Sequence, residues 1–217
     1  MTDQNLTHLY FLLDRSGSME SIRTDIEGGF SAFINEQRTQ TGACRVTLAK
    51  FDDHYEEVYR DLPVAEVPDL DLQPRGTTAL LDSIGRLVSE AGTRLAALPE
   101  EQRPGNVIVA IMTDGQENAS RELTHPAIKA MIERQSTDYG WQFLFMGSDQ
   151  DAIEVGASIG IARDNSLTYS RGQAAVTMAM TSRKISRYRQ SRAAGASVNE
   201  ARVGLVYSDE DRAAATE

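Results

Sequence analysis

The sequence has a single cysteine, no long apolar run and fewer basic than acidic residues. Cys44 alone excludes an intramolecular disulfide and a cysteine-based zinc cluster. It lies in the strand-like run ACRVTLAKF, where we interpret it as a buried apolar residue rather than a nucleophile. No apolar stretch reaches the roughly 18 residues that span a bilayer, and the N-terminal MTDQNLTH lacks the basic and apolar regions of a secretory signal. We therefore expect a cytoplasmic protein with no part in a membrane.

The shortage of basic residues also limits the partners. There are 22 lysines and arginines against 32 aspartates and glutamates, a formal net charge of −10. Such a chain repels nucleic-acid phosphates and anionic lipid, so neither is expected as a partner. The basic run RKISRYRQSR, residues 183–192, is interpreted as the solvated face of a final helix, with docking of an acidic partner as the alternative.

Short apolar runs alternate with helix-like segments along most of the chain. The runs LTHLYFLL, RVTLAKF, NVIVAIMTDG, WQFLFMG and NSLTYS show little polar alternation, which is typical of strands buried on both faces. The charged run FDDHYEEVYRDLPV, closed by a proline, indicates an edge strand. The pattern predicts an α/β fold: a doubly wound, mostly parallel sheet with one antiparallel edge strand and helices on both faces. Residues 1–195 are expected to form a single domain and residues 196–217 a flexible C-terminal tail.

An acidic run follows the second predicted strand. Between Asp52 and Asp71 there are eight acidic residues and one arginine. We interpret this run as a solvated edge and loop. A calcium-binding loop is the alternative, but the ligand spacing and central glycine of an EF-hand are absent.

Side chains with oxygen atoms lie in three loops that we expect at the carboxyl ends of the strands. They are Asp14, Ser16 and Ser18 after the first strand, Thr77 and Thr78 in the glycine-marked loop before the long helix, and Asp114 at the end of NVIVAIMTDG. Ligands of such sheets collect at the carboxyl ends of the strands. Asp149 and Asp151, after the strand WQFLFMG, are interpreted as helix-capping residues that could border the same site.

Two carboxylates and several hydroxyls, without histidine or cysteine, form a hard-oxygen set. Such a set suits Mg²⁺ or Mn²⁺ and suits Zn²⁺ or Cu²⁺ poorly. Residues two apart in an extended segment point the same way, so Asp14, Ser16 and Ser18 can converge. Neutral hydroxyls leave a bound ion electron-poor, so we expect it to favour an added anionic ligand.

The three segments DRSGS, GTT and TDG, in this order and spacing, resemble the von Willebrand factor type A (vWA) domain family over about residues 6–170. In that family they form the metal-ion-dependent adhesion site. The resemblance implies that Ser16, Ser18 and a threonine contact the metal, and that Asp14 and Asp114 bind it directly or through water. The family's threonine falls on Thr78, because TALLDSIG matches the family's T-A-L-x-D-A-I run, with Thr77 as the neighbouring alternative.

The resemblance also implies a function without turnover. Family members bind proteins through the metal, with a glutamate or aspartate of the partner completing its coordination. The chain resembles small, stand-alone bacterial members, some of which belong to stress-response or metal-resistance systems. The residues do not identify the partner or the oligomeric state.

An enzyme is the alternative function. A magnesium-dependent phosphohydrolase of the haloacid-dehalogenase type also begins with an aspartate after the first strand, but it needs a second aspartate where this chain has Ser16. There is no G-x-S-x-G elbow and no G-x-x-x-x-G-K-[ST] loop. The three histidines, His8, His54 and His125, are not placed beside a nucleophile and are interpreted as structural or solvent-facing.

Overall fold

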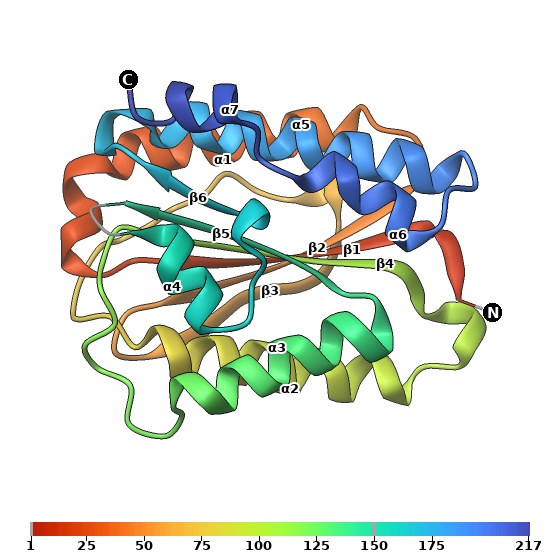
Figure 1. Ribbon diagram of the computed structural model, residues 1–217, viewed down its shortest axis with the longest axis horizontal. Coiled ribbons are helices and arrows are strands. Elements are labelled where there is room, and N and C mark those ends of the chain that lie inside the picture. The colour runs from red at the N-terminus through yellow and green to blue at the C-terminus, as the bar shows by residue number, and fades with distance from the viewer. Residues whose placement is uncertain (1, 149–150) are drawn as a thin grey trace.

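The computed structural model describes residues 2–148 and 151–217, which form a central sheet between two layers of helices (Figure 1). Six described strands pair in the order β3-β2-β1-β4-β5-β6. They are β1 (Asp3–Asp14), β2 (Ala43–Phe51), β3 (Tyr55–Pro63), β4 (Pro104–Thr113), β5 (Gln142–Ser148) and β6 (Ser166–Tyr169). The pair β2–β3 is antiparallel and the other pairs are parallel. The predicted doubly wound sheet with an antiparallel edge strand is confirmed.

Helices cover both faces of this sheet (Figure 1). One face carries α1 (Arg23–Arg38) and α5 (Ala174–Ala193), with the short α6 (Val198–Ala201) and α7 (Asp209–Ala214) near α5. The other carries α2 (Leu80–Ala97), α3 (His125–Tyr139) and α4 (Ala152–Ser158). Within the described residues, no helix is long and apolar enough to cross a membrane.

Alternate residues of β1 feed two separate cores. Leu9, Phe11 and Leu13 pack in the core under α1 and α5, whereas Tyr10 and Leu12 pack in the core under α2 and α3. Successive side chains of a strand point to opposite faces, so a strand covered on both sides must be apolar at every position. This explains the uninterrupted apolar runs that predicted the sheet. Cys44 is also buried, as expected for a packing residue.

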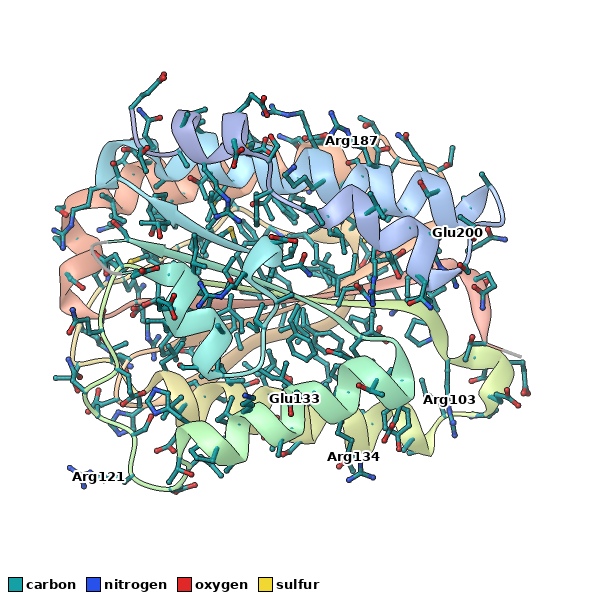
Figure 2. The ribbon with its side chains drawn as sticks, viewed as in Figure 1. Arg103, Arg121, Glu133, Arg134, Arg187 and Glu200 are labelled. Carbon is teal, nitrogen blue, oxygen red and sulfur yellow. The ribbon has the colours of Figure 1, made fainter. Side chains whose placement is uncertain are left out.

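The basic run of α5 is not a solvated face, and that interpretation is wrong for three of its residues. Lys184, Arg189 and Arg192 are buried, whereas Arg187 points away from the sheet (Figure 2). Arg189 donates to the main-chain and side-chain oxygens of Gln37 at 3.0 and 2.9 Å. Arg192 donates to Asn106 Oδ1 at 2.7 Å. The two arginines therefore donate to oxygen acceptors near the end of α1 and near the start of β4. The sequence pattern gives no sign of these acceptors.

The segment after residue 195 differs from the flexible tail that the sequence suggests. It forms α6, a 3₁₀ turn and α7, and it buries Leu205, Tyr207 and Ala215. The Tyr207 hydroxyl lies 2.8 Å from Thr181 Oγ1 on α5, and Lys184 Nζ donates to the carbonyl of Val206 at 2.6 Å. A few apolar anchors among polar residues therefore fix this segment to α5.

His8 on β1 is buried in its neutral form. Its Nε2 lies 2.9 Å from Thr47 Oγ1, and its ring stacks on Tyr10 with centroids 4.1 Å apart. Burial lowers the pKa of His8 to about 4, although the nearby Asp61 carboxylate opposes this. Between about pH 6.5 and pH 4, His8 is therefore protonated in the unfolded chain and neutral in the folded chain.

We expect His8 to make the protein acid-sensitive. Because its folded pKa is depressed, its neutral burial contributes fully above about pH 6.5, and up to about 3 kcal/mol of unfolding free energy is lost between pH 6.5 and 4. The variant His8→Gln lacks this titration and can still reach Thr47, so its stability should fall less steeply. Urea unfolding at several pH values measures both slopes, and parallel curves would contradict the assignment.

Candidate functional site

The sheet topology brings two of the predicted loops together. β1 and β4 are parallel neighbours with Leu13 opposite Met112, so both end at the same edge. Asp14 is the last residue of β1, and Asp114 follows directly after β4. From β1 the strands are added first on one side, as β2 and β3, and then on the other side, as β4, β5 and β6. The strand order therefore reverses between β1 and β4, which is where doubly wound sheets form their ligand sites.

Hydrogen bonds join the residues of these two loops. Thr113 Oγ1 donates to Asp14 Oδ2 at 2.5 Å, and the Ser16 amide donates to Asp14 Oδ1 at 2.6 Å. The hydroxyls of Ser16 and Ser18 are 3.1 Å apart, and Ser18 Oγ donates to Asp114 Oδ1 at 2.6 Å. Four of the five predicted site residues thus belong to one network.

The fifth residue, Thr78, is placed by its distance from Gly115. A Cβ added to Gly115 would lie 2.7 Å from Thr78 Oγ1 and 3.4 Å from both Asp14 Oδ2 and Ser16 Oγ. Oxygens from two separate loops, the one after β1 and the one before α2, therefore surround one point, which the missing side chain of Gly115 leaves open. Thr78 is buried there, whereas Thr77 is exposed, so the geometry favours Thr78 over its neighbour.

The electrostatics of the site favour a cation. The side chains of Asp14 and Asp114 are fully buried or nearly so. Burial raises the pKa of Asp14 to about 6, the Asp114 charge adds to the rise, and hydrogen bonds from Thr113 and Ser16 oppose it. Carboxylates and hydroxyls with no nitrogen or sulfur are donors that suit Mg²⁺ or Mn²⁺. The residues present therefore fit a hard divalent cation.

Sequence reasoning missed the part that Asp52 plays beside this site. Asp52 Oδ2 accepts hydrogen bonds from Arg15 Nε at 3.0 Å and Arg75 Nε at 2.8 Å. The Asp52 carbonyl accepts from the Ala79 amide at 2.8 Å, and the Arg75 amide donates to the Arg15 carbonyl at 2.7 Å. Arg15 lies between Asp14 and Ser16, and Ala79 follows Thr78. Asp52 therefore ties the loop after β1 to the loop before α2.

The pKa of Asp52 reflects these contacts. Its burial acts to raise the pKa, but the hydrogen bonds from Arg75 and the His54 amide and the charges of both arginines hold the pKa below its usual value. Asp52 was interpreted as part of a solvated acidic run, yet its side chain is fully buried. The interpretation is therefore wrong for Asp52. The arginine inside the DRSGS motif was the signal that could have suggested a buried acidic partner.

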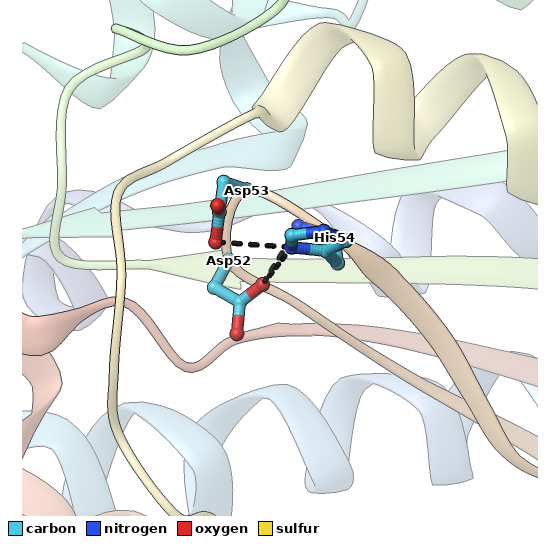
Figure 3. A group of neighbouring side chains, drawn as sticks. All are labelled: Asp52, Asp53 and His54. Carbon is cyan, nitrogen blue, oxygen red and sulfur yellow. Dashed lines mark hydrogen bonds and ion pairs between the residues drawn. The ribbon is translucent and has the colours of Figure 1, made fainter.

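Asp52, Asp53 and His54 form a second acidic group (Figure 3). Their potential ligand atoms lie within 4.8 Å of one another, and His54 Nδ1 is 3.2 Å from Asp53 Oδ1. Because the carboxylate of Asp52 already pairs with two guanidinium groups, this group fits a cation less well than the Asp14 site does.

The remaining acidic candidates lie after β5. Asp151 caps α4, since its Oδ1 accepts from the amides of Ile153 and Glu154 at 3.1 Å, as predicted. Asp149 lies outside the described residues.

Comparisons with known proteins bear on the fold. No family model matches the sequence, and no curated protein matches it. Among solved structures, the chain is similar to the ArnB paralog VWA2 from Sulfolobus acidocaldarius, with a TM-score of 0.53 and 15% identity over 80% of this chain and 44% of that one. The von Willebrand factor type A protein from Catenulispora acidiphila gives a TM-score of 0.56 and 15% identity over 83% of this chain and 43% of that one.

A third similar structure is a domain of nearly the same size. The vWF domain of the type V pili tip protein Mfa5 from Porphyromonas gingivalis gives a TM-score of 0.56 and 12% identity over 82% of this chain and 94% of that one. The chain spans less than half the length of the first two proteins. The sheet order, the helices on both faces and these likenesses agree: the chain has the fold of a von Willebrand factor type A domain.

Proposed function

We propose that the chain is a metal-dependent protein-binding module. It binds one Mg²⁺ or Mn²⁺ through Asp14, Ser16, Ser18, Thr78 and Asp114, and then a glutamate or aspartate of a partner protein, without turnover. The convergence of Asp14, Ser16 and Thr78 oxygens around the open face of Gly115 carries this proposal. The bacterial stress-response or metal-resistance setting implied by the sequence resemblance stays a prediction.

The donor set explains why a carboxylate is the expected ligand. Three of the five donors are neutral hydroxyls, and the Asp14 carboxylate already accepts hydrogen bonds from Thr113 and the Ser16 amide, so it shares less charge with a bound ion. The ion supplies a Lewis-acidic position that favours a further anionic oxygen. This chain's own residues hold the ion and shape the rim on which the partner rests.

The phosphohydrolase alternative has less support. Its acid/base would stand at position 16, where this chain has a serine whose hydroxyl contacts Ser18. A serine hydroxyl is a far weaker acid than a carboxyl and does not serve as a general acid/base near neutral pH as a carboxyl can. A binding role therefore agrees better with the site.

The two adjacent threonines provide the test. We expect Thr78→Ala to weaken Mn²⁺ binding about 10- to 100-fold, because it removes an oxygen from the convergence point. Thr77→Ala is the matched control: its side chain is exposed, and its variant should keep wild-type affinity. Calorimetric titration measures both. Equal losses in the two variants, or no Mn²⁺ binding by the wild type, would contradict the proposed site.

A further inference from the structure

Arg171 reaches the candidate metal site from the far edge of the sheet. It begins the short 3₁₀ turn η5 (Arg171–Gln173), just after β6. Its Nη2 lies 3.6 Å from Asp114 Oδ2, and its Nη1 donates to Ser21 Oγ at 3.2 Å. The Asp114 side chain is fully buried, whereas that of Arg171 is 41% exposed. The guanidinium therefore lies at the rim of the site, in contact with Asp114 and Ser21 and partly exposed.

The charge of Arg171 acts in opposite directions on the two ligands of the proposed function. A divalent cation held by Asp114 is repelled by a guanidinium a few ångströms away, although partial exposure screens this repulsion. A carboxylate that reaches the cation leaves one oxygen free. A guanidinium at the rim can donate to that oxygen, because its planar fork presents several N–H groups.

The anchoring of Arg171 keeps its charge at this place. Ser21 belongs to the turn η1 (Gly17–Ile22), which begins inside the DRSGS motif and includes Ser18. Arg171 thus contacts segments on both sides of the site: the turn after β1 and the aspartate after β4. The two terminal nitrogens of the guanidinium fork make these two contacts.

We propose that Arg171 couples the two binding events: it lowers the affinity for the cation alone and raises the affinity for a carboxylate once the cation is bound. This inference rests on the proposed function. The coupling is reciprocal by linkage, so a carboxylate must raise the cation affinity by the same factor. A site of this kind stays weakly loaded until a partner with an acidic residue arrives.

Manganese and acetate are the probes for this coupling. Mn²⁺ is titrated into the full chain and Arg171→Gln, in chloride and in acetate at equal ionic strength. In the wild type, acetate should raise the apparent Mn²⁺ affinity about 5- to 10-fold. In Arg171→Gln, the affinity in chloride should rise about threefold and the acetate effect should fall below about twofold. Complexation of Mn²⁺ by acetate in solution is the same for both proteins and cancels in the comparison.

Two further variants separate coupling from general charge. Arg171→Lys keeps the charge without the fork, so its affinity in chloride should match the wild type while its acetate effect is reduced. Arg163→Gln removes an exposed arginine that pairs with Glu154, 2.6 Å away, and should behave as the wild type in both salts.

The outcomes distinguish the inference from the proposed function. An unchanged acetate effect in Arg171→Gln, or an affinity in chloride that does not rise, overturns the coupling and leaves the metal site standing. A changed thermal stability with an unchanged acetate effect assigns Arg171 a structural role and overturns the coupling as well. If Arg163→Gln behaves as Arg171→Gln does, net charge explains the result and the inference fails. If Mn²⁺ binds neither protein, the proposed function fails and the inference with it.

Discussion

Replacing Gly115 with alanine is expected to lower the Mn²⁺ affinity more than about 100-fold while the protein stays folded. The added methyl group would lie 2.7 Å from Thr78 Oγ1 and 3.4 Å from oxygens of Asp14 and Ser16. It would occupy the point that these oxygens surround and push Thr78 away from it. Loss of several donors at once exceeds the 10- to 100-fold effect typical of a single supporting residue. Calorimetric titration of Mn²⁺ measures the affinity, and near-ultraviolet circular dichroism checks the fold.

Two other glycines serve as controls for this substitution. A Cβ at Gly28 on α1 or at Gly172 in η5 would meet no atom within 4 Å. Both alanine variants should therefore keep wild-type Mn²⁺ affinity, and Gly28→Ala should gain slightly in stability because alanine favours the helix. Wild-type affinity in Gly115→Ala would show that the oxygens do not converge on a bound ion.

The sheet could be predicted because each strand can be recognised from its own residues, without knowledge of the rest of the chain. The part of a strand that is buried on both faces is mostly apolar, and β1, β4 and β5 each contain an uninterrupted apolar run, at residues 9–13, 107–112 and 143–146. The edge strand β3 alternates between exposed and partly buried residues and is charged, as an edge requires. Local composition was sufficient at each of these places.

Only part of the candidate site could be predicted from local sequence in this way. Asp14, Ser16, Ser18 and Asp114 follow strands whose ends the topology must bring together, so their proximity follows from the fold class. Choosing Thr78 over Thr77 needed either a family pattern or the direction of a loop side chain. The structure supplies the second, through the distance of Thr78 from Gly115.

Buried charges were the part that sequence reasoning could not place. Asp52, Arg189 and Arg192 each stand in a run of charged residues, and such runs are usually solvated. What buries these three is a partner far along the chain: Arg15 for Asp52, Gln37 for Arg189 and Asn106 for Arg192. The arginine inside DRSGS could have suggested an acidic partner, but the single sequence does not say which residue that partner is, and it gives no sign of the other two pairs.

Asp52→Ala is expected to destabilise the protein by about 3 kcal/mol. Removal of one partner of a buried ion pair typically costs about 3–5 kcal/mol, because the other charge stays buried. Arg15 is only 3% exposed and would lose its bond to Asp52. It keeps the carboxylate of Glu56, which is half exposed, so we expect the lower end of the range. Urea unfolding measures the change in the free energy of unfolding.

Asp53→Ala is the matched control. Its side chain is 49% exposed and pairs with the exposed His54, so its loss should change the stability by no more than about 0.5 kcal/mol. A similar loss in both variants would show that charge in this turn, and not the bond to Arg15, stabilises the fold.

A double-mutant cycle with Arg15→Met isolates the interaction itself. Once position 15 is neutral, Asp52→Ala leaves no unpaired buried charge, so the double variant should be more stable than the sum of the single losses by about 1–3 kcal/mol.

Arg15 is the residue between Asp14 and Ser16, and its carbonyl also accepts from the Arg75 amide. The same cycle followed by Mn²⁺ titration therefore tests whether Asp52 keeps the two loops in place for the cation. We expect a 10- to 100-fold weaker affinity in Asp52→Ala, and wild-type affinity in that variant would limit Asp52 to stability alone.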